Sequence, residues 1–379
     1  MTEKLYYLDA YTKEFEAVIL SVEESGDGFL VVLNKTAFFP EEGGQYSDKG
    51  YIGDARVWNV YEENGTVYHV CDKIPGENRV LCKIDFDERY EKMQIHTAEH
   101  IISGVFHNVF GYENVGFHLG ADVVTMDINA VLTEKDIVFA EEAANRVVYE
   151  NVPVTTHFPT PDELSQLKYR AKLDLTENVR LVKIGEHDLC ACCAPHVKSS
   201  GEVGLIRLLD FTKHRGGTRI TITAGIRAAR DSRYRYETVR EISALLSVPK
   251  NDVADGVRRL ISDYEEAKSQ IKRARSDYYL LLAKNIAPTD KNLVLHYPEA
   301  DAEDAKTIAN ELIMRVGGIL VILFGKEGEF KYLMVSKSRD LRALSKDINS
   351  ALGGRGGGKP EAIQGTLTAA LDEVREYFK

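Results

Sequence analysis

The chain has 379 residues, which is room for two to four domains, because single hydrophobic cores rarely grow beyond about 250 to 300 residues. No apolar run approaches the roughly 20 residues that span a bilayer, and Met1 to Leu5 lack the character of a signal segment. We therefore expect a cytoplasmic protein without a membrane partner. Taken alone, the formal net charge of −11 argues against nucleic acid as a partner, since polyanion binding depends on Lys and Arg.

The N-terminal part, residues 1–86, alternates apolar and polar residues between Gly and Asn turns, which predicts a small all-β domain, most simply a β-barrel. The loop from Phe38 to Gly50 contains Gly43, Gly44 and Gln45, and its backbone could approach a ligand closely; ordinary turn chemistry is the alternative. The expected strands are Phe15 to Leu20, Phe29 to Leu33, Ala55 to Val60, Thr66 to Val70 and Arg79 to Ile84.

Residues 87–228 change to a mixed pattern, which predicts an α+β domain. Its first element is a helix from Arg89 to Val109, and further helices are expected at Glu134 to Asn151 and Asp162 to Ala171. The expected strands are Val123 to Ile128, Val152 to His157, Val179 to Ile184, Gly204 to Leu209 and Thr218 to Gly225.

Two pairs of candidate metal ligands fall in this domain. His96 and His100 are one helical turn apart on the same face, and Cys192 and His196 repeat the four-residue spacing far downstream. A mixed nitrogen and sulfur set suits Zn²⁺ better than Mg²⁺ or Ca²⁺, which prefer oxygen ligands. One His pair alone is often a surface or core feature, but a second pair at matching spacing favours a zinc site.

The zinc-protease motif HExxH is excluded, because Thr97 follows the first histidine where that motif needs a glutamate. Glu99 precedes the second histidine instead, and we expect it to point away from the ligand face. Five cysteines, with Cys190, Cys192 and Cys193 in one turn, indicate a metal or redox site in a reducing compartment rather than a disulfide framework. Cys71 and Cys82 are interpreted as ordinary buried residues or at most a strand pair, without a functional role.

Residues 229–285 are helical, with a break at Val248 and Pro249. Beyond the break, apolar residues recur in alternating steps of four and three, as in the seam of a coiled coil or helical hairpin. Such a seam needs a partner helix, so we expect a homodimer. The seam is formed by Val253, Val257, Leu260, Tyr264, Ala267, Ile271, Ala274, Tyr278 and Leu281.

The last segment, residues 286–379, predicts a small α/β domain. Strands are expected at Leu293 to Leu295, Gly318 to Leu323 and Lys331 to Val335, and helices at Ala302 to Val316, Leu341 to Asn349 and Gly365 to Tyr377. The glycines from Gly353 to Pro360, beside Arg355 and Lys359, predict a flexible basic loop whose amides can face phosphate; a solvated linker is the alternative. A Walker loop is excluded, because Pro360 follows Lys359.

Basic residues gather in three runs in the second half, Arg207 to Arg240, Lys268 to Arg275 and Lys337 to Lys359. Either these runs are solvated faces or they contact a polyanion the size of a tRNA.

Several of these motifs resemble a known family. The HTAEH motif at His96 to His100, the Cys192 to His196 segment, Gly216 to Ile220 and Phe39 to Gln45 are similar to the editing half of alanyl-tRNA synthetase, and the seam helix with the glycine-rich loop resembles that enzyme's DHH-associated C-terminal domain. Because no aminoacylation domain fits in front of Met1, the chain resembles the freestanding, long (AlaX-type) alanyl-tRNA editing proteins.

The resemblance implies a function, namely hydrolysis of serine, and in some members glycine, from mischarged tRNA(Ala). It places the family's four zinc ligands on His96, His100, Cys192 and His196, although Cys190 could compete as the sulfur ligand. Whether zinc activates water or anchors the substrate stays open. A zinc-containing tRNA-binding protein without catalysis and a small-molecule metallohydrolase are the alternatives.

The candidate contacts fall into two groups. A polar group that bonds the seryl hydroxyl would separate serine from alanine. The candidates for substrate binding are Gln45, Asn114, His118, Thr125, Gly43 and Gly44, and those for tRNA binding are Arg215, Arg219, Arg355 and Lys359.

Overall fold

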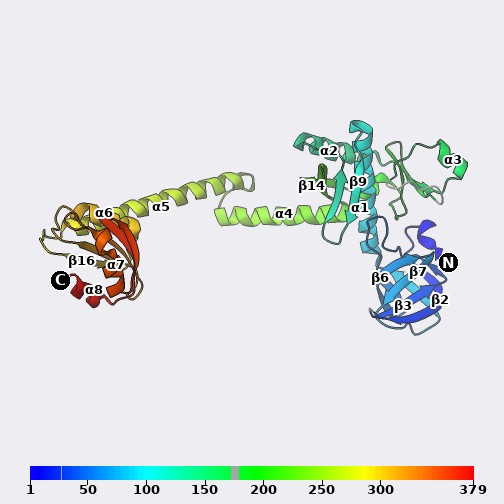
Figure 1. The fold of residues 1–379 in the computed structure, drawn as a ribbon. Helices are drawn as coiled ribbons and strands as arrows, with labels where there is room; N and C mark the ends of the chain where they lie inside the picture. Colours follow the sequence, from blue (N-terminus) through cyan, green and yellow to red (C-terminus); the bar gives the residue numbers. More distant parts are fainter. Residues whose placement is uncertain (27, 172–178) are drawn as a thin grey trace. The chain divides into compact units, whose positions relative to one another are not determined.

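The structure is a computed structural model that describes residues 1–26, 28–171 and 179–379. The chain divides into two compact units, Met1–Arg240 and Glu241–Lys379 (Figure 1). The expected α+β multidomain class is confirmed. Our division at residues 86, 228 and 285 is finer than these two units and stays a prediction. In the described ranges, no helix is both long and apolar enough to pass through a membrane.

Six strands near the N-terminus pair in a closed ring in the order β2-β3-β7-β6-β5-β8. Along β8, Val80, Cys82 and Ile84 are buried while their neighbours are exposed, so the inner face of the ring forms one hydrophobic core. The bounds are β2 Glu14–Ser25, β3 Gly28–Leu33, β5 Gly50–Ile52, β6 Ala55–Glu63, β7 Thr66–Cys71 and β8 Arg79–Ile84. Beside the ring lie β1 Glu3–Lys4, η1 Leu5–Tyr7 and β4 Lys35–Thr36.

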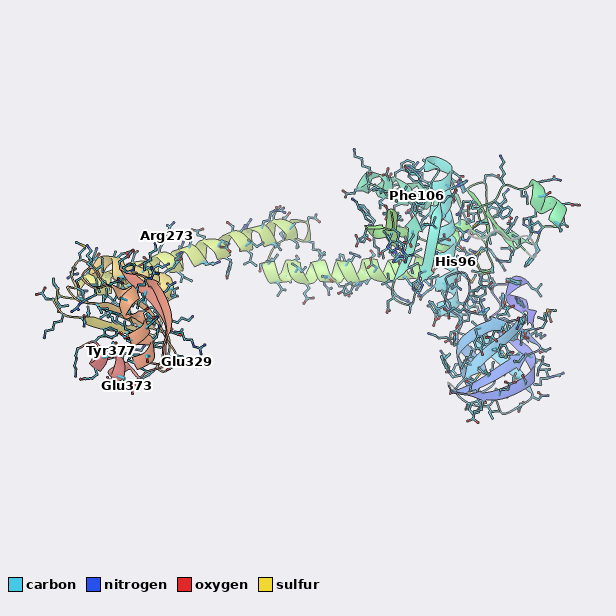
Figure 2. The ribbon with its side chains drawn as sticks, viewed as in Figure 1. His96, Phe106, Arg273, Glu329, Glu373 and Tyr377 are labelled. Carbon is cyan, nitrogen blue, oxygen red and sulfur yellow. The ribbon has the colours of Figure 1, made fainter. Side chains whose placement is uncertain are left out.

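Helix α1, Phe86–Val105, is the central element of the rest of the first unit. Sixteen of its 20 residues are buried, because it packs against α2, β9, β13 and β15. Figure 2 shows His96 on the part of α1 closer to the ring of strands, whereas Phe106, the first residue of the following η2 (Phe106–Phe110), lies farther from it. At Gly104 a Cβ would lie 2.6 Å from the backbone oxygen of His187, so glycine permits the close approach of α1 to the turn before β13.

Two sheets flank this helix, with strand orders β14-β15-β10-β9 and β11-β12-β13. The elements are η2 Phe106–Phe110, β9 Asn114–Leu119, β10 Val124–Ile128, α2 Glu134–Glu150, β11 Val154–His157, α3 Pro161–Gln166, β12 Leu181–Ile184, β13 Asp188–Ala191, η3 Ser200–Val203, β14 Ile206–His214 and β15 Gly217–Ala224. All of the expected elements exist, but α3 ends five residues early, and neither β9 nor β13 was predicted. Cys190, which we expected in one turn with Cys192, lies on strand β13.

One buried ion cluster fixes α1 on the ring of strands. Asp48, in the loop before β5, pairs with Arg89 and Lys92 of α1, and all three side chains are at most 1% exposed. Asp48 also accepts a hydrogen bond of 2.7 Å from the backbone N–H of Phe39. The ring and the metal-ligand helix are therefore joined by charge-assisted hydrogen bonds that water does not reach.

Two long helices follow β15. Helix α4 spans Gly225–Leu246, η4 spans Lys250–Asp252, and α5 runs Val253–Lys284 after the predicted break. Much of the predicted seam is exposed on α5, including Leu260, Tyr264 and Ile271.

The second unit contains a five-stranded sheet of order β16-β17-β18-β20-β19, in which only β16 and β17 run parallel. One face packs on α5 and α6, and the other on α7 and α8. The bounds are β16 Leu293–Tyr297, α6 Ala302–Leu312, β17 Leu320–Phe324, β18 Phe330–Val335, α7 Leu341–Ala351, β19 Arg355–Lys359, β20 Ala362–Leu367 and α8 Leu371–Tyr377.

Two expectations about this unit are wrong. The glycine-rich stretch is not a flexible loop, because β19 pairs along its whole length with β20. The helix expected from Gly365 is also shorter, since Ala362–Leu367 is strand β20 and helix α8 begins only at Leu371.

Candidate metal centre

The four expected ligands come together in the first unit. His96 and His100 project from α1, and their ring centres are 5.6 Å apart. The ring of His196 lies 5.1 Å from His96 and 4.8 Å from His100. With Cys192, these side chains place one ligand atom each within 4.8 Å of one another. The four side chains that were selected by their spacing in the sequence therefore lie close enough together to bind one ion.

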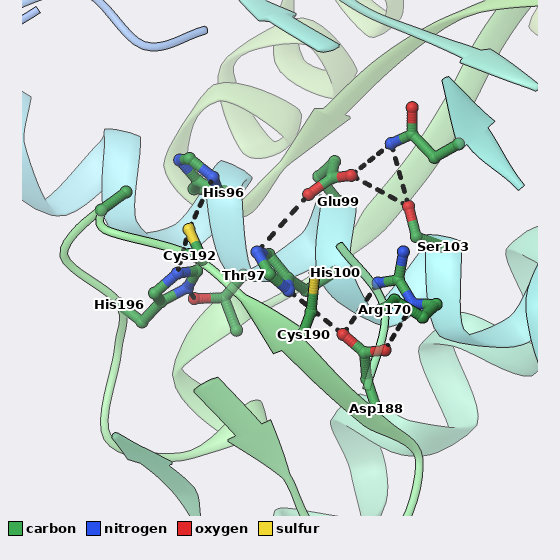
Figure 3. Close-up of polar contacts among 12 residues, drawn as sticks. His96, Thr97, Glu99, His100, Ser103, Arg170, Asp188, Cys190, Cys192 and His196 are labelled. Carbon is green, nitrogen blue, oxygen red and sulfur yellow. Dashed lines mark hydrogen bonds and ion pairs between the residues drawn. The ribbon is translucent and has the colours of Figure 1, made fainter. Parts of the chain in front are cut away.

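The segment after β13 that carries Cys192 is held by Arg180. The backbone N–H of Cys192 donates to the Arg180 carbonyl at 3.0 Å. In return, the Arg180 guanidinium donates to the carbonyls of Cys192 and Ala194, both at 2.9 Å. The Cys192 sulfur lies 3.5 Å from Nε2 of His96 and 3.4 Å from Nε2 of His196 (Figure 3).

Each of the three imidazoles has its Nδ1 engaged by a different outer partner. The contacts are His96 with Gln45 Oε1 at 2.9 Å, His100 with Asp188 Oδ2 at 3.1 Å, and His196 with Thr97 Oγ1 at 3.0 Å. Such contacts set the tautomer and the ring orientation of metal-binding histidines. All three Nε2 atoms are therefore left for the centre of the cluster.

The donor set fits a tetrahedral zinc ion. With Zn–S near ~2.3 Å and Zn–N near ~2.05 Å, sulfur and nitrogen ligands lie about 3.6 Å apart, close to the two sulfur–nitrogen distances observed. Burial alone would raise the pKa of the Cys192 thiol, but His96 and His196 hold it well below its usual range. The thiolate is the form of cysteine that binds metals.

The other two cysteines of the turn are less suited as ligands. Cys190 belongs to a second possible group with His100 and Asp188. There, however, the Asp188 carboxylate is already paired with Arg170 through contacts of 2.7 and 2.9 Å, and a guanidinium beside the group disfavours a second cation. Burial raises the pKa of Cys193, which disfavours its thiolate. Cys192 is therefore the better sulfur ligand.

Glu99 does not point away from the ligands, which corrects our expectation. It lines the same cavity as His96 and His100, and its Oε2 lies 3.7 Å from Nε2 of His100. Its other oxygen accepts hydrogen bonds from Ser103, at 2.9 Å, and from Asn114. The motif thus places a buried carboxylate next to the metal ligands.

The cluster opens into a cavity of about 520 Å³. Gly43 and Gly44 form part of its wall. Gly44 has a φ of +79° and an added Cβ would lie 2.4 Å from the Phe117 carbonyl, so only glycine lets this loop dock on β9. The remaining lining residues are Tyr7, Glu42, His96, Glu99, His100, Phe117, Phe158, Arg170, Ala171, Arg180, Cys190, Ala191, Cys192 and Cys193.

The other substrate-binding candidates occupy different positions. Gln45 and Asn114 are buried and hold His96 and Glu99. His118 and Thr125 face each other across β9 and β10. None of these four polar candidates is among the residues that line the cavity. Sequence reasoning did not single out Tyr7, Phe158 or Arg180, which do line it; none belongs to a spacing motif.

The basic candidates are distributed over both units. Arg219 forms a two-contact ion pair with Asp127, at 2.7 and 2.8 Å, so its charge is compensated. Arg215 lies in the turn between β14 and β15 with a φ of +46°. Arg355 and Lys359 are exposed on β19 of the second unit.

Three stretches of the chain match family models of tRNA-synthetase domains. Residues 4–87 match the model "tRNA synthetases class II (A)", residues 179–221 match "Threonyl and Alanyl tRNA synthetase second additional domain", and residues 290–379 match "DHHA1 domain". The middle match contains the cysteine and histidine of the second ligand pair.

Individual relatives show more specifically which of these proteins the chain is similar to. The chain is 28% identical to the alanyl-tRNA editing protein AlaX-L of Pyrococcus horikoshii, over 99% of this chain and 96% of that protein. It is 29% identical to the alanine–tRNA ligases of Halorubrum lacusprofundi and Pyrococcus abyssi, of which it spans only 44% and 42%. The resemblance to a freestanding, long-form alanyl-tRNA editing protein is therefore confirmed.

Among solved structures, the C-Ala domain from Aquifex aeolicus alanyl-tRNA synthetase covers 24% of this chain and 87% of its own, at 19% identity and a TM-score of 0.21, which is too low to bear on the fold.

Proposed function

We propose that this protein is a zinc-dependent deacylase that hydrolyses the ester of serine, or of glycine, mischarged onto tRNA(Ala). The observation that carries the proposal is the grouping of three imidazoles and the Cys192 sulfur, with one ligand atom each within 4.8 Å of one another and each histidine held through Nδ1, at the wall of a cavity. The names of the relatives support tRNA as the substrate class. His96, His100, Cys192 and His196 would hold the ion.

A bound zinc ion would supply Lewis acidity toward the amino acid or toward a water molecule. The residues of the chain bind and orient the substrate. The aminoacyl ester is intrinsically labile, so the cavity needs mainly to hold the ester and to exclude other reactants. The Gly43–Gly44 wall leaves room beside the ligands. Glu99, fixed by Ser103 and Asn114, presents a negative charge to which the α-ammonium group of the substrate can bind.

Selection of serine over alanine requires a polar partner for the seryl hydroxyl. Among the four polar candidates, Gln45 touches a metal ligand through Oε1 while its buried Nε2 has no hydrogen-bond partner within the described part of the chain. An unpaired buried donor costs free energy that a seryl hydroxyl would recover and an alanyl methyl group would not. Gln45 is therefore our choice, ahead of Asn114, His118 and Thr125.

The test is deacylation of Ser-tRNA(Ala), Gly-tRNA(Ala) and Ala-tRNA(Ala), with the zinc content measured in the same preparations. Wild type should clear the seryl ester selectively. Cys192→Ala should lose both zinc and activity, whereas the matched variant Cys190→Ala should keep both, because Cys190 faces the Asp188–Arg170 pair instead.

Other outcomes would select a different function. A zinc-loaded protein that binds tRNA without cleaving any ester would be a tRNA-binding protein without catalysis. Equal cleavage of seryl esters with and without tRNA would indicate a small-molecule metallohydrolase.

We also propose tRNA contacts at Arg215, Arg355 and Lys359, with Arg219 contributing less because Asp127 compensates it. Charge reversal at each position should weaken tRNA binding and reduce its salt dependence.

The exposed apolar face of α5 leads us to propose a homodimer. Leu260, Tyr264 and Ile271 are each more than half exposed, which is unfavourable in water for a face of this length. Light scattering should give twice the chain mass for wild type, and Ile271→Glu should shift the protein toward the monomer.

A further inference from the structure

The cavity beside the metal ligands has a second wall that the hydrolysis of an ester does not require. It is formed by two aromatic rings, Tyr7 and Phe158, together with the guanidinium of Arg180. The two rings meet edge to face, with centres 5.5 Å apart and planes at 74°. Tyr7 comes from η1 beside the ring of strands and Phe158 from the segment after β11, so the fold brings them together from distant parts of the chain.

The two rings differ in what their faces contact. Cationic groups lie over the ring of Tyr7, with Lys4 Nζ at 5.6 Å and the Arg180 guanidinium at 5.4 Å from its centre. Phe158, in contrast, is 52% exposed although it lines a cavity. A phenyl ring that is held by one aromatic neighbour and is about half exposed can serve as a stacking platform for another flat ring.

Arg180 adds a positive charge at this wall. The residue is only 6% exposed, and its two contacts at 2.9 Å are to carbonyl oxygens. Within the described ranges it forms no ion pair with a carboxylate, and its buried Nε has no hydrogen-bond partner. A buried guanidinium without a carboxylate partner is costly. The neighbouring Cys192 thiolate offsets part of that cost, and an anionic ligand in the cavity would offset more.

The volume of the cavity also favours a ligand larger than an amino acid. At about 520 Å³ it falls in the range of sites that hold whole small-molecule ligands, roughly 300 to 1,000 Å³. A seryl group alone would leave much of it empty. In an aminoacyl-tRNA the amino acid is esterified to the ribose of the 3′-terminal adenosine, so a flat base and a phosphodiester necessarily accompany it.

We propose that this wall binds the 3′-terminal nucleotide of the tRNA, with the adenine stacked on Phe158 and the phosphate directed toward the charge of Arg180. The proposal rests on the proposed function for the identity of the substrate. Since Arg180 also bonds the Cys192 carbonyl, the nucleotide and the sulfur ligand are held by one side chain. Seating of the nucleotide would then add binding free energy that holds the substrate beside the ligand cluster.

The test compares Phe158→Ala and Phe158→Trp with the matched control Phe139→Ala. Phe139 is also a partly exposed phenylalanine, 40% exposed, with one edge-to-face partner, and it lines none of the cavities described. Two substrates are used, Ser-tRNA(Ala) and serine methyl ester, which lacks the nucleotide. Binding of the trinucleotide C-C-A is measured separately by titration.

Loss of a stacked base should raise the KM for Ser-tRNA(Ala) about 5- to 100-fold in Phe158→Ala, with kcat nearly unchanged. The C-C-A affinity should fall by a similar factor, Phe158→Trp should restore both, and cleavage of serine methyl ester should not change. The control Phe139→Ala should match wild type throughout.

Equal KM values in wild type and Phe158→Ala would overturn the platform, as would an equal loss with the nucleotide-free ester. If no ester is cleaved by wild type, the deacylase function fails, but the C-C-A titration still decides the platform by itself, because it measures binding and requires no catalysis.

Discussion

Substitution of Asp48 by Asn should destabilise the first unit strongly. Arg89 and Lys92 are fully buried, and in the described structure Asp48 is the only equally buried acidic residue that pairs with them. Its carboxylate lies 2.7 Å from Nε of Arg89 and 3.0 Å from Nζ of Lys92. Removing one member of a buried ion pair leaves the others uncompensated, at a cost of about 3–5 kcal/mol. Here two cations would remain, so we expect a loss toward the upper end of that range.

Part of this stabilisation depends on pH. Burial alone would raise the pKa of Asp48, but Arg89 and Lys92 hold it at about 2, below the ordinary 3.8. The unfolded chain therefore binds the proton more readily. The contribution is fully present above about pH 4 and is lost as the pH falls through 2; a shift from 3.8 to about 2 corresponds to about 2 kcal/mol.

Urea unfolding followed by tryptophan fluorescence reports on this unit, because the only tryptophan, Trp58, lies on β6. The control is Asp54→Asn, which removes the same charge from an exposed ion pair with Lys73 and should leave the midpoint unchanged. The reasoning is refuted if Asp48→Asn unfolds at the wild-type midpoint at pH 7, or if the difference between the two proteins does not shrink between pH 4 and pH 2.

Three further predictions concern the site and the core. Asp188→Asn should weaken zinc binding about 10- to 100-fold in a chelator competition, because it loosens the hold on Nδ1 of His100; an unchanged affinity would contradict the positioning role. Burial raises the pKa of Cys71 and Cys82 to about 12, so iodoacetamide at pH 8 should leave both unmodified in the native protein, as intact mass and peptide mapping would report. Gly44→Ala should cost more activity and stability than Gly43→Ala, since an added Cβ at Gly44 lies 2.4 Å from a carbonyl oxygen whereas at Gly43 the nearest atom is a sulfur at 3.5 Å; equal losses would count against the docking of this loop.

Sequence periodicity predicted the ligand pairs because both depend on short-range spacing. His96 and His100 need only a helix, and the Cys192 to His196 spacing needs only one turn. The partners of the histidines could not be predicted in the same way. Gln45 lies 51 residues from His96, and Asp188 lies 88 residues from His100, so only the tertiary fold pairs them.

The prediction of a loop in the glycine-rich stretch of the second unit was wrong for a local physical reason. Gly356 to Gly358 have low strand propensity and no side chains to alternate, so the pattern reads as a loop. The strand forms because β20 supplies hydrogen-bonding partners along its length. At Gly356 an added Cβ would lie 2.3 Å from the Tyr332 hydroxyl, which shows that the glycine permits a close approach inside the sheet.

Strand β19 also has a consequence for the solution behaviour of the protein. It is the outermost strand of its sheet, and an edge strand can offer unpaired N–H and C=O groups to another strand, although the Gly356 carbonyl already accepts a hydrogen bond from Asn349. With glycine at its three central positions it offers no steric obstacle to such pairing. Arg355 and Lys359, one at each end, are the charges that oppose it, since a second copy would have to bring like charges together. The charges of Arg355 and Lys359 therefore disfavour aggregation through this edge of the sheet.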